Sequence, residues 1–107
     1  MCGMNKAGFA VLYRWKVRSD ARVAFVAAWS AATSAFQTIG ALGSRLHRSE
    51  DGDFYAYAEW PSREAWERAK AHSPVDSATS TVMRDATLEF EARPLEIEAD
   101  LLTRSAG

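Results

Sequence analysis

The chain has 107 residues, of which 48% are hydrophobic and 25% are charged, and its formal net charge is −1. This length suits one domain with one modest core, and the small net charge gives a nucleic acid no electrostatic reason to bind. The only cysteine, Cys2, cannot form an intramolecular disulfide, and no apolar run approaches the roughly 20 residues of a membrane span. We therefore expect a single domain over 1–107, located in the cytoplasm, with no nucleic-acid or membrane partner.

The first predicted element is a strand over 9–17, which is rich in aromatic and β-branched residues. Alternate side chains of a strand share a face, so Tyr13 and Trp15 belong to its more apolar side. Arg14 and Lys16 then belong to the opposite side.

A helix is predicted next, over 19–40, because apolar residues recur there at helical spacing. Ser19 or Asp20 can cap its start, and Gly40 can end it. Trp29 belongs to the apolar stripe that faces the sheet.

Two strands, over 41–48 and 54–60, are joined by a turn that admits two registers. A two-residue turn would put His47 opposite Ala56, whereas a three-residue loop with Gly52 in the left-handed conformation would put His47 opposite Tyr55. The second register separates polar from apolar side chains, so it is the one we predict.

The second half of the chain repeats the pattern of helix and strand. Ser62 can cap a helix over 63–72, with Ala65, Trp66 and Ala69 as its buried stripe. One or two further helical turns are expected within 75–85. The strand expected over 86–93 directs three residues inward, namely Leu88, Phe90 and Ala92.

The element order predicts an α+β fold of the ferredoxin-like split βαβ type, with a four-stranded antiparallel sheet and both helices on one face. The core spans about 8–93, and 94–107 is an edge strand or an arm that reaches a neighbour. The uncovered sheet face carries tyrosines and opposite charges, which a second copy of the chain would cover. The residues predicted for this homodimer interface are Arg45, His47, Tyr55, Tyr57 and Glu59.

Two stretches carry a resemblance to a known family: "YRWKV" at 13–17 and "GALGSRLHRSEDGDFYAYAEWPSREAWERA" at 40–69. With the element order, they make the chain similar to the antibiotic biosynthesis monooxygenase family of dimeric α+β barrels over roughly 8–93. The resemblance implies a homodimer whose sheets face each other, with a pocket between sheet and helices in each subunit. Some members oxidise polycyclic phenols with molecular oxygen and no cofactor, others degrade haem, and many have no assigned reaction.

The quinone-forming members place an Asn four residues before a strand-end Trp, an aromatic residue six after it, and an Arg further on. Here Trp60 matches the strand-end Trp and Trp66 the later aromatic residue. Ala56 replaces the Asn, so its amide donor is missing, and Arg84 is the candidate for the Arg.

The haem-degrading members pair an Asn on the first strand with a Trp and a His on the second helix. Tyr13 and Ala69 occupy the first two of these positions, and His72 does not match the third. We therefore expect no haem. The sequence also lacks the His and Cys spacing of a metal site, so the expected reaction needs molecular oxygen as co-substrate and neither cofactor nor metal.

The preferred hypothesis is a cofactor-independent monooxygenase acting on a small aromatic phenol or enol. Its expected catalytic residues are Tyr13, Trp60 and Trp66. The residues expected to bind the substrate are Trp15, Trp29, Phe54, Ala56 and Arg84. His47 could act as a general base, but its assigned face favours a hydrogen bond at the interface.

The first alternative is a non-catalytic ligand-binding or stress-related dimer that uses the same pocket. The second is a protein whose polar sheet face only assembles subunits. A cavity between Trp29, Trp60 and Trp66 distinguishes these hypotheses, because without a void there the enzyme would have no site.

Overall fold

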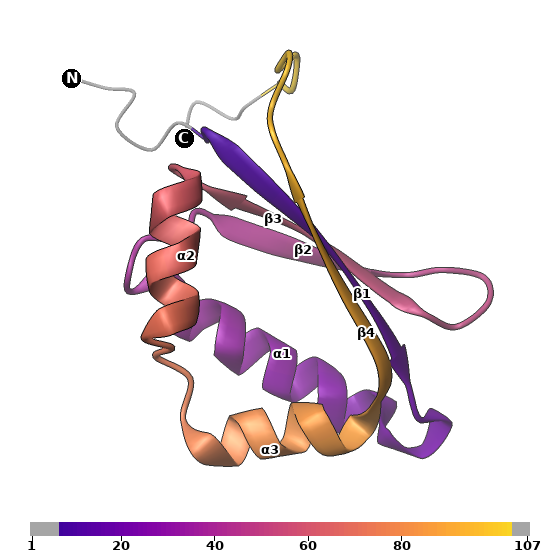
Figure 1. Cartoon of the computed structure of the whole chain (residues 1–107). Helices are drawn as coiled ribbons and strands as arrows, with labels where there is room; N and C mark the ends of the chain where they lie inside the picture. Colours follow the sequence, from indigo (N-terminus) through magenta and orange to yellow (C-terminus); the bar gives the residue numbers. More distant parts are fainter. Residues whose placement is uncertain (1–6, 104–107) are drawn as a thin grey trace.

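The computed structural model describes residues 7–103, so Cys2 lies outside the described residues. Its elements in chain order are β1 (Phe9–Val17), a 3₁₀ turn (Ser19–Ala21), α1 (Arg22–Gln37), β2 (Gly43–Arg48), β3 (Phe54–Trp60), α2 (Arg63–Ala71), α3 (Ser77–Ala86) and β4 (Thr87–Leu95). The strands form one antiparallel sheet in the order β2-β3-β1-β4, and the helices lie on one side of it (Figure 1). This is the predicted ferredoxin-like α+β fold.

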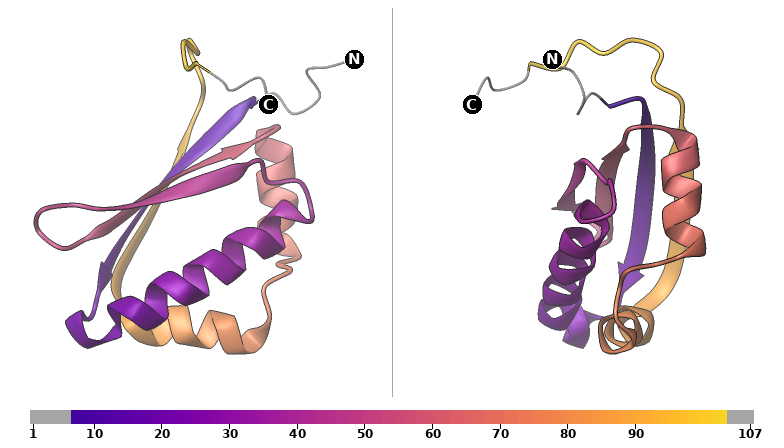
Figure 2. Two further views of the ribbon diagram at one scale, coloured as in Figure 1. Left: turned by 180° about the vertical axis from the view of Figure 1, so that it is seen from behind. Right: turned by 90° about the vertical axis from the view of Figure 1, so that its left-hand side faces the viewer.

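Among residues 7–103, no helix lies on the other face of the sheet. The right-hand view of Figure 2 looks onto the helices, with β1 visible behind and between α1 and α2. After β4 the chain continues past the end of the sheet (Figure 1). Within the described residues, no helix is long and apolar enough to cross a membrane.

The β2–β3 hairpin has the predicted three-residue loop. Arg45 lies opposite Tyr57 and His47 opposite Tyr55. Gly52 has φ +95°, a left-handed conformation that glycine adopts without the steric penalty of a Cβ atom. The preferred register is therefore confirmed.

The helix boundaries follow local capping chemistry, with one correction. The Ser62 hydroxyl accepts the Ala65 N–H at 3.1 Å, as predicted, and the Asp76 carboxylate caps the predicted α3 by accepting the Thr79 N–H at 2.7 Å. The prediction that Ser19 or Asp20 caps the first helix was wrong. Both residues lie in the 3₁₀ turn, and α1 begins after Ala21 with no side-chain cap.

β4 also differs from expectation. Between Lys16 and Val17 of β1 the register shifts, which leaves Leu88 unpaired and 59% exposed instead of inward. The strand continues through Pro94 to Leu95, which an edge strand tolerates because one side of it makes no ladder hydrogen bonds. From 96 to 103 the chain has no strand, so this segment is not an edge strand. Its role as an arm reaching a neighbour stays a prediction.

The buried core is divided into two clusters. One joins Phe9 and Trp60 at one end of the sheet to Trp66 of α2. The other joins Trp15 at the opposite end of β1 to Phe25 of α1. Tyr13, midway along β1, packs against both clusters, so the space between them is bridged by a phenol.

Replacing Phe25 with alanine tests the second cluster. The ring is fully buried, 5.2 Å from the Phe54 ring and 5.3 Å from the Trp15 ring. We expect F25A to lower the free energy of unfolding by about 3–5 kcal/mol, measured by urea denaturation. V23A on the exposed side of α1 is the control and should change it by less than about 0.5 kcal/mol. Equal effects of the two variants would contradict this account of the core.

Candidate functional site

A cavity of about 600 Å³ lies between the sheet and the three helices, in the space between the two core clusters. Its aromatic lining residues are Tyr13, Trp15, Trp29, Phe36, Trp60, Trp66 and Phe90. This volume is large enough for a small aromatic molecule, and an apolar wall with a few polar groups is typical of ligand sites. The three tryptophans 29, 60 and 66 therefore line a void instead of filling it.

Tyr13 and Trp66 form the central polar contact of the cavity. β1 directs the Tyr13 ring toward the helices, and Trp66 Nε1 on α2 donates a hydrogen bond to the Tyr13 hydroxyl oxygen at 3.1 Å. Burial raises the pKa of Tyr13 above its ordinary value, and the hydrogen bond from Trp66 offsets part of that rise. The phenol is thus held in its neutral form, and its own O–H proton is not used in the bond to Trp66.

The wall along β4 is open to solvent. The Phe90 ring lies 6.1 Å from Tyr13 and 5.7 Å from Trp15, yet Phe90 is 57% exposed. Ala92, the next residue of β4 on the same face, is exposed too and also lines the cavity, so the cavity is open to solvent along this strand.

Trp60 supplies the part of the cavity wall next to Phe36. The centres of the two rings are 5.9 Å apart, and the rings pack edge to face. The indole Nε1 of Trp60 is buried and has no hydrogen-bond partner. An unpaired buried donor of this kind costs about 1–3 kcal/mol.

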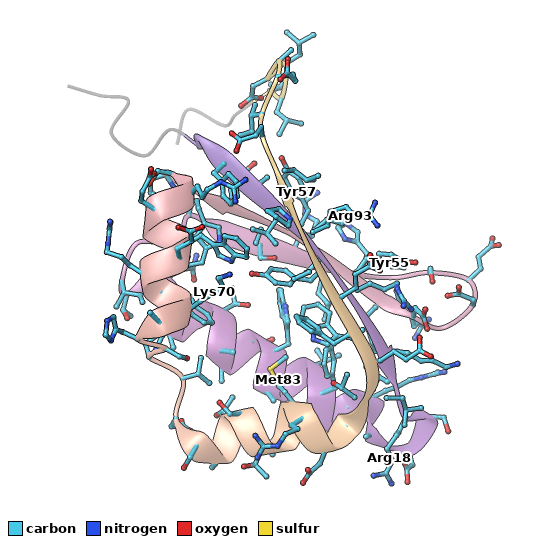
Figure 3. The ribbon with its side chains drawn as sticks, in the orientation of Figure 1. Arg18, Tyr55, Tyr57, Lys70, Met83 and Arg93 are labelled. Atoms are coloured by element: carbon cyan, nitrogen blue, oxygen red, sulfur yellow. The ribbon has the colours of Figure 1, made fainter. Side chains whose placement is uncertain are left out.

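Lys70 was not identified from the sequence. It stands four residues after Trp66, on the same face of α2, and its Nζ lies 3.6 Å from the centre of the Trp66 ring. Figure 3 shows Lys70 of α2 and Met83 of α3 extending into the space between the helices and the sheet. The i, i+4 spacing to Trp66 was the signal that could have revealed Lys70.

Three predicted substrate-binding residues lie outside this cavity. Phe54 and Ala56 are buried in the second core cluster, and neither lines the cavity. Arg84 is exposed, donates a hydrogen bond to Thr81 at 3.2 Å, and borders a separate hollow of about 420 Å³ at the start of β4. Trp15 and Trp29 do line the cavity, as do the three predicted catalytic residues.

The residues predicted for the interface all lie on the open sheet face. Figure 3 shows Tyr55 and Tyr57 on the side of the sheet away from the helices. His47 Nδ1 is 3.4 Å from the Tyr55 carbonyl oxygen, and His47 is not among the residues that line the cavity. Between this face and residues 97–103 lies a hollow of about 900 Å³, whose lining includes Arg45.

Charge on the open face is organised around Arg14. Its guanidinium nitrogens lie 2.8 Å from an Asp53 carboxylate oxygen, 3.3 Å from one of Glu89 and 3.6 Å from one of Glu91. These carboxylates raise the pKa of Arg14, with Asp53 the main cause. The pKa of Glu91 is lowered, chiefly by Arg93.

Few groups that could act as an acid or a base line the cavity. In the described part of the chain, no carboxylate or imidazole lines it, and Lys70 is its only charged residue. Nor do three or more His, Cys, Asp or Glu residues gather into a metal site anywhere between 7 and 103. The groups available for chemistry are therefore the Tyr13 hydroxyl, the Lys70 ammonium and small hydroxyls such as Ser80.

Residues 8–79 match the model of the antibiotic biosynthesis monooxygenase family. Among curated proteins, none matches the sequence significantly. Of solved structures, SnoaB, a cofactor-independent oxygenase from Streptomyces nogalater, is similar with a TM-score of 0.76 at 19% identity, covering 89% of this chain and 97% of that one.

Two further structures share the fold. Rv0793 from Mycobacterium tuberculosis has a TM-score of 0.74 at 19% identity, over 90% of this chain and 100% of that one. A dimeric ferredoxin-like protein from an uncultured marine organism has a TM-score of 0.74 at 7% identity, over 94% and 96%. At these identities the likeness establishes the fold.

The ionisation of Tyr13 tests the geometry of the site. Subtracting the tyrosinate absorbance titration of Y13F from that of the wild type should give one phenol with a midpoint above the ordinary value of 10.0. The stability that this neutral phenol contributes is fully present below the unfolded-state pKa and is lost as pH rises through the folded-state value. Y55F, which removes a phenol from the open face, provides the reference subtraction. A Tyr13 midpoint at or below 10.0 would mean that the ring is not buried as described.

Proposed function

The chain belongs to the antibiotic biosynthesis monooxygenase family, and we propose that it is a cofactor-independent monooxygenase that oxidises a small phenol or enol in the cavity between sheet and helices. The observation that carries the proposal is the Tyr13–Trp66 hydrogen bond at 3.1 Å inside an aromatic cavity of about 600 Å³. Flat aromatic walls orient a ring, and the phenol hydroxyl offers a donor to one substrate oxygen.

In the proposed reaction a ring methylene of the substrate, in its enolate or phenolate form, becomes a carbonyl. The carbanionic carbon adds to molecular oxygen and forms a peroxide, and the O–O bond then breaks. One oxygen atom stays on carbon, the other leaves as water with both methylene hydrogens, and the substrate supplies all four electrons. No separate reductant is required, so this reaction needs neither a flavin nor a metal.

The protein's part is to bind, orient and exclude water. Trp15, Trp29 and Trp60 hold the ring, while Tyr13 donates its proton toward the substrate oxygen on which negative charge develops. Trp66 fixes the direction of that hydroxyl by donating to its oxygen. Burial favours the neutral phenol and therefore favours a donor at this position.

A non-catalytic ligand-binding protein is the second candidate. The observation that favours it is the lack of a carboxylate or imidazole among the described residues that line the cavity, because phenol oxidation begins with loss of a proton. Binding without turnover is the outcome that this candidate requires.

We also propose that a second copy of the chain covers the open sheet face. This face carries half-buried tyrosines beside charged side chains, an arrangement suited to burial against a matching surface. In a two-fold dimer the same residues meet on both subunits, and residues 97–103 lie over the hollow beside this face, within reach of a partner.

Turnover tests the monooxygenase proposal. The purified protein is titrated with anthrols and naphthols in the absence of oxygen, and saturable quenching of tryptophan fluorescence is expected. Admission of labelled dioxygen should then give a quinone that carries one labelled oxygen atom per turnover. Y13F should lower kcat about a hundredfold because a donor to the developing oxyanion is lost.

The control is S34A, which removes an exposed hydroxyl from α1 and should leave the rate unchanged. Saturable binding with no oxygen uptake would contradict the monooxygenase and support the ligand-binding protein. Equal rates for Y13F and S34A would remove Tyr13 from the mechanism.

Sedimentation equilibrium tests the dimer. The wild type is expected at twice the 11.8 kDa of one chain, and Y57D near 11.8 kDa, because the substitution places an unpaired charge in the buried interface. V23D adds the same charge to an exposed position on α1 and should remain a dimer. A wild-type protein that sediments as one chain would refute this interface.

A further inference from the structure

Lys70 has an unusual environment for a surface lysine. Its Nζ lies over the Trp66 ring at 3.6 Å, and it forms no ion pair with any residue that the structure describes. Arg63, one turn before Trp66 on the same helix, instead contacts the carboxylates of Glu67 and Glu96. The Lys70 ammonium is therefore a cation held in place by an aromatic face and without a fixed counter-ion.

The position of Lys70 connects it to the polar centre of the cavity. Trp66 receives the ammonium on its ring face and donates its N–H to the Tyr13 hydroxyl, so both polar groups contact one indole. Lys70 is also exposed on its outer side, which places it at the rim of the cavity. A ligand that lies against the aromatic wall would thus meet a cation at the rim and a phenol farther in.

A single cation in an otherwise uncharged, largely apolar site discriminates between charge states. Attraction between opposite charges is stronger beside a low-dielectric wall than in water, and no acidic residue in the described lining competes for the ammonium. A phenol bound there loses its proton more easily, because the positive charge favours the phenolate.

We propose that Lys70 is the anion-binding group of the cavity and that it selects aromatic ligands in the phenolate or enolate form. This inference rests on the proposed function and deepens it, because it names the residue that binds the anionic substrate. It also accounts for a cavity without a general base. The substrate proton leaves to solvent at the open rim, and Lys70 stabilises the anion that remains to react with oxygen.

The probe that tests this is 4-nitrophenol, whose phenolate absorbs visible light, with 4-nitroanisole as a partner of the same ring that cannot ionise. Binding of both is measured without oxygen by calorimetry, and the ionisation of bound 4-nitrophenol by absorbance. The wild type should prefer the phenolate over the neutral phenol by about tenfold, which lowers the pKa of the bound probe by about one unit.

K70Q should abolish this preference and leave the affinity for 4-nitroanisole unchanged, whereas K70R should retain it. R68Q provides the matched control, since it removes one positive charge from the same helix at an exposed position outside the cavity lining. Equal loss in K70Q and R68Q would show a general charge effect and overturn the proposal, as would a wild type that binds neither probe or binds both forms equally.

The outcome is distinguishable from that of the turnover experiment, because no step of it requires oxygen. Phenolate selectivity that depends on Lys70 would stand even if no quinone forms. Quinone formation that K70Q leaves unchanged would support the monooxygenase and reject the role of Lys70.

Discussion

The register of the β2–β3 hairpin is the constraint on which both faces of the sheet depend. Gly52, at φ +95°, allows a three-residue loop, and that loop sets His47 opposite Tyr55. A slip of one residue would exchange the two faces of a strand. Because β3 is also paired with β1, β2 is the strand that would turn over. Leu46 would then leave the core, and Arg45 and His47 would enter the space beneath the helices. The loop that Gly52 allows therefore determines which side chains of β2 face the helices and which lie on the open face.

Periodicity in the sequence predicts these faces well, because alternation in a strand is a local property. It predicts the position of Tyr13 and the register at Tyr55 for that reason. It fails at Leu88, where the register shift depends on how β4 leaves α3 and rejoins β1. It also fails at the start of α1, where the 3₁₀ turn takes up the residues that could have capped the helix. Both failures lie at junctions between elements, where tertiary contacts override local preference.

Some residues of the candidate site could likewise be predicted from the sequence, and others could not. The aromatic wall could be predicted, because tryptophans on known faces must converge between sheet and helices. Lys70 could not be found by the same reasoning, since a lysine on a helix usually belongs to the solvated side. Its proximity to Trp66 follows from their i, i+4 spacing. Its place in the cavity lining depends on the rotation of α2 about its axis, which packing of Ala69 and Trp66 against the sheet sets. Arg84, taken from the family pattern, lies beside a different hollow because α3 carries it away from the cavity.

The cavity is retained at a cost in stability. A void of about 600 Å³ deprives its lining of packing partners, and the buried Nε1 of Trp60 has no hydrogen bond. A sequence selected only for stability would fill this space, since the two core clusters already hold the ends of the sheet against α1 and α2. Dividing the core in two keeps the packing at each end intact while the middle stays open. Of the residues that the structure describes, Tyr13 alone packs against both clusters, so the side chain that completes the fold there also lines the cavity with its hydroxyl bonded to Trp66. A fold arranged in this way leaves an aromatic void with one oriented hydroxyl in its wall, which is the physical reason to expect binding at this cavity.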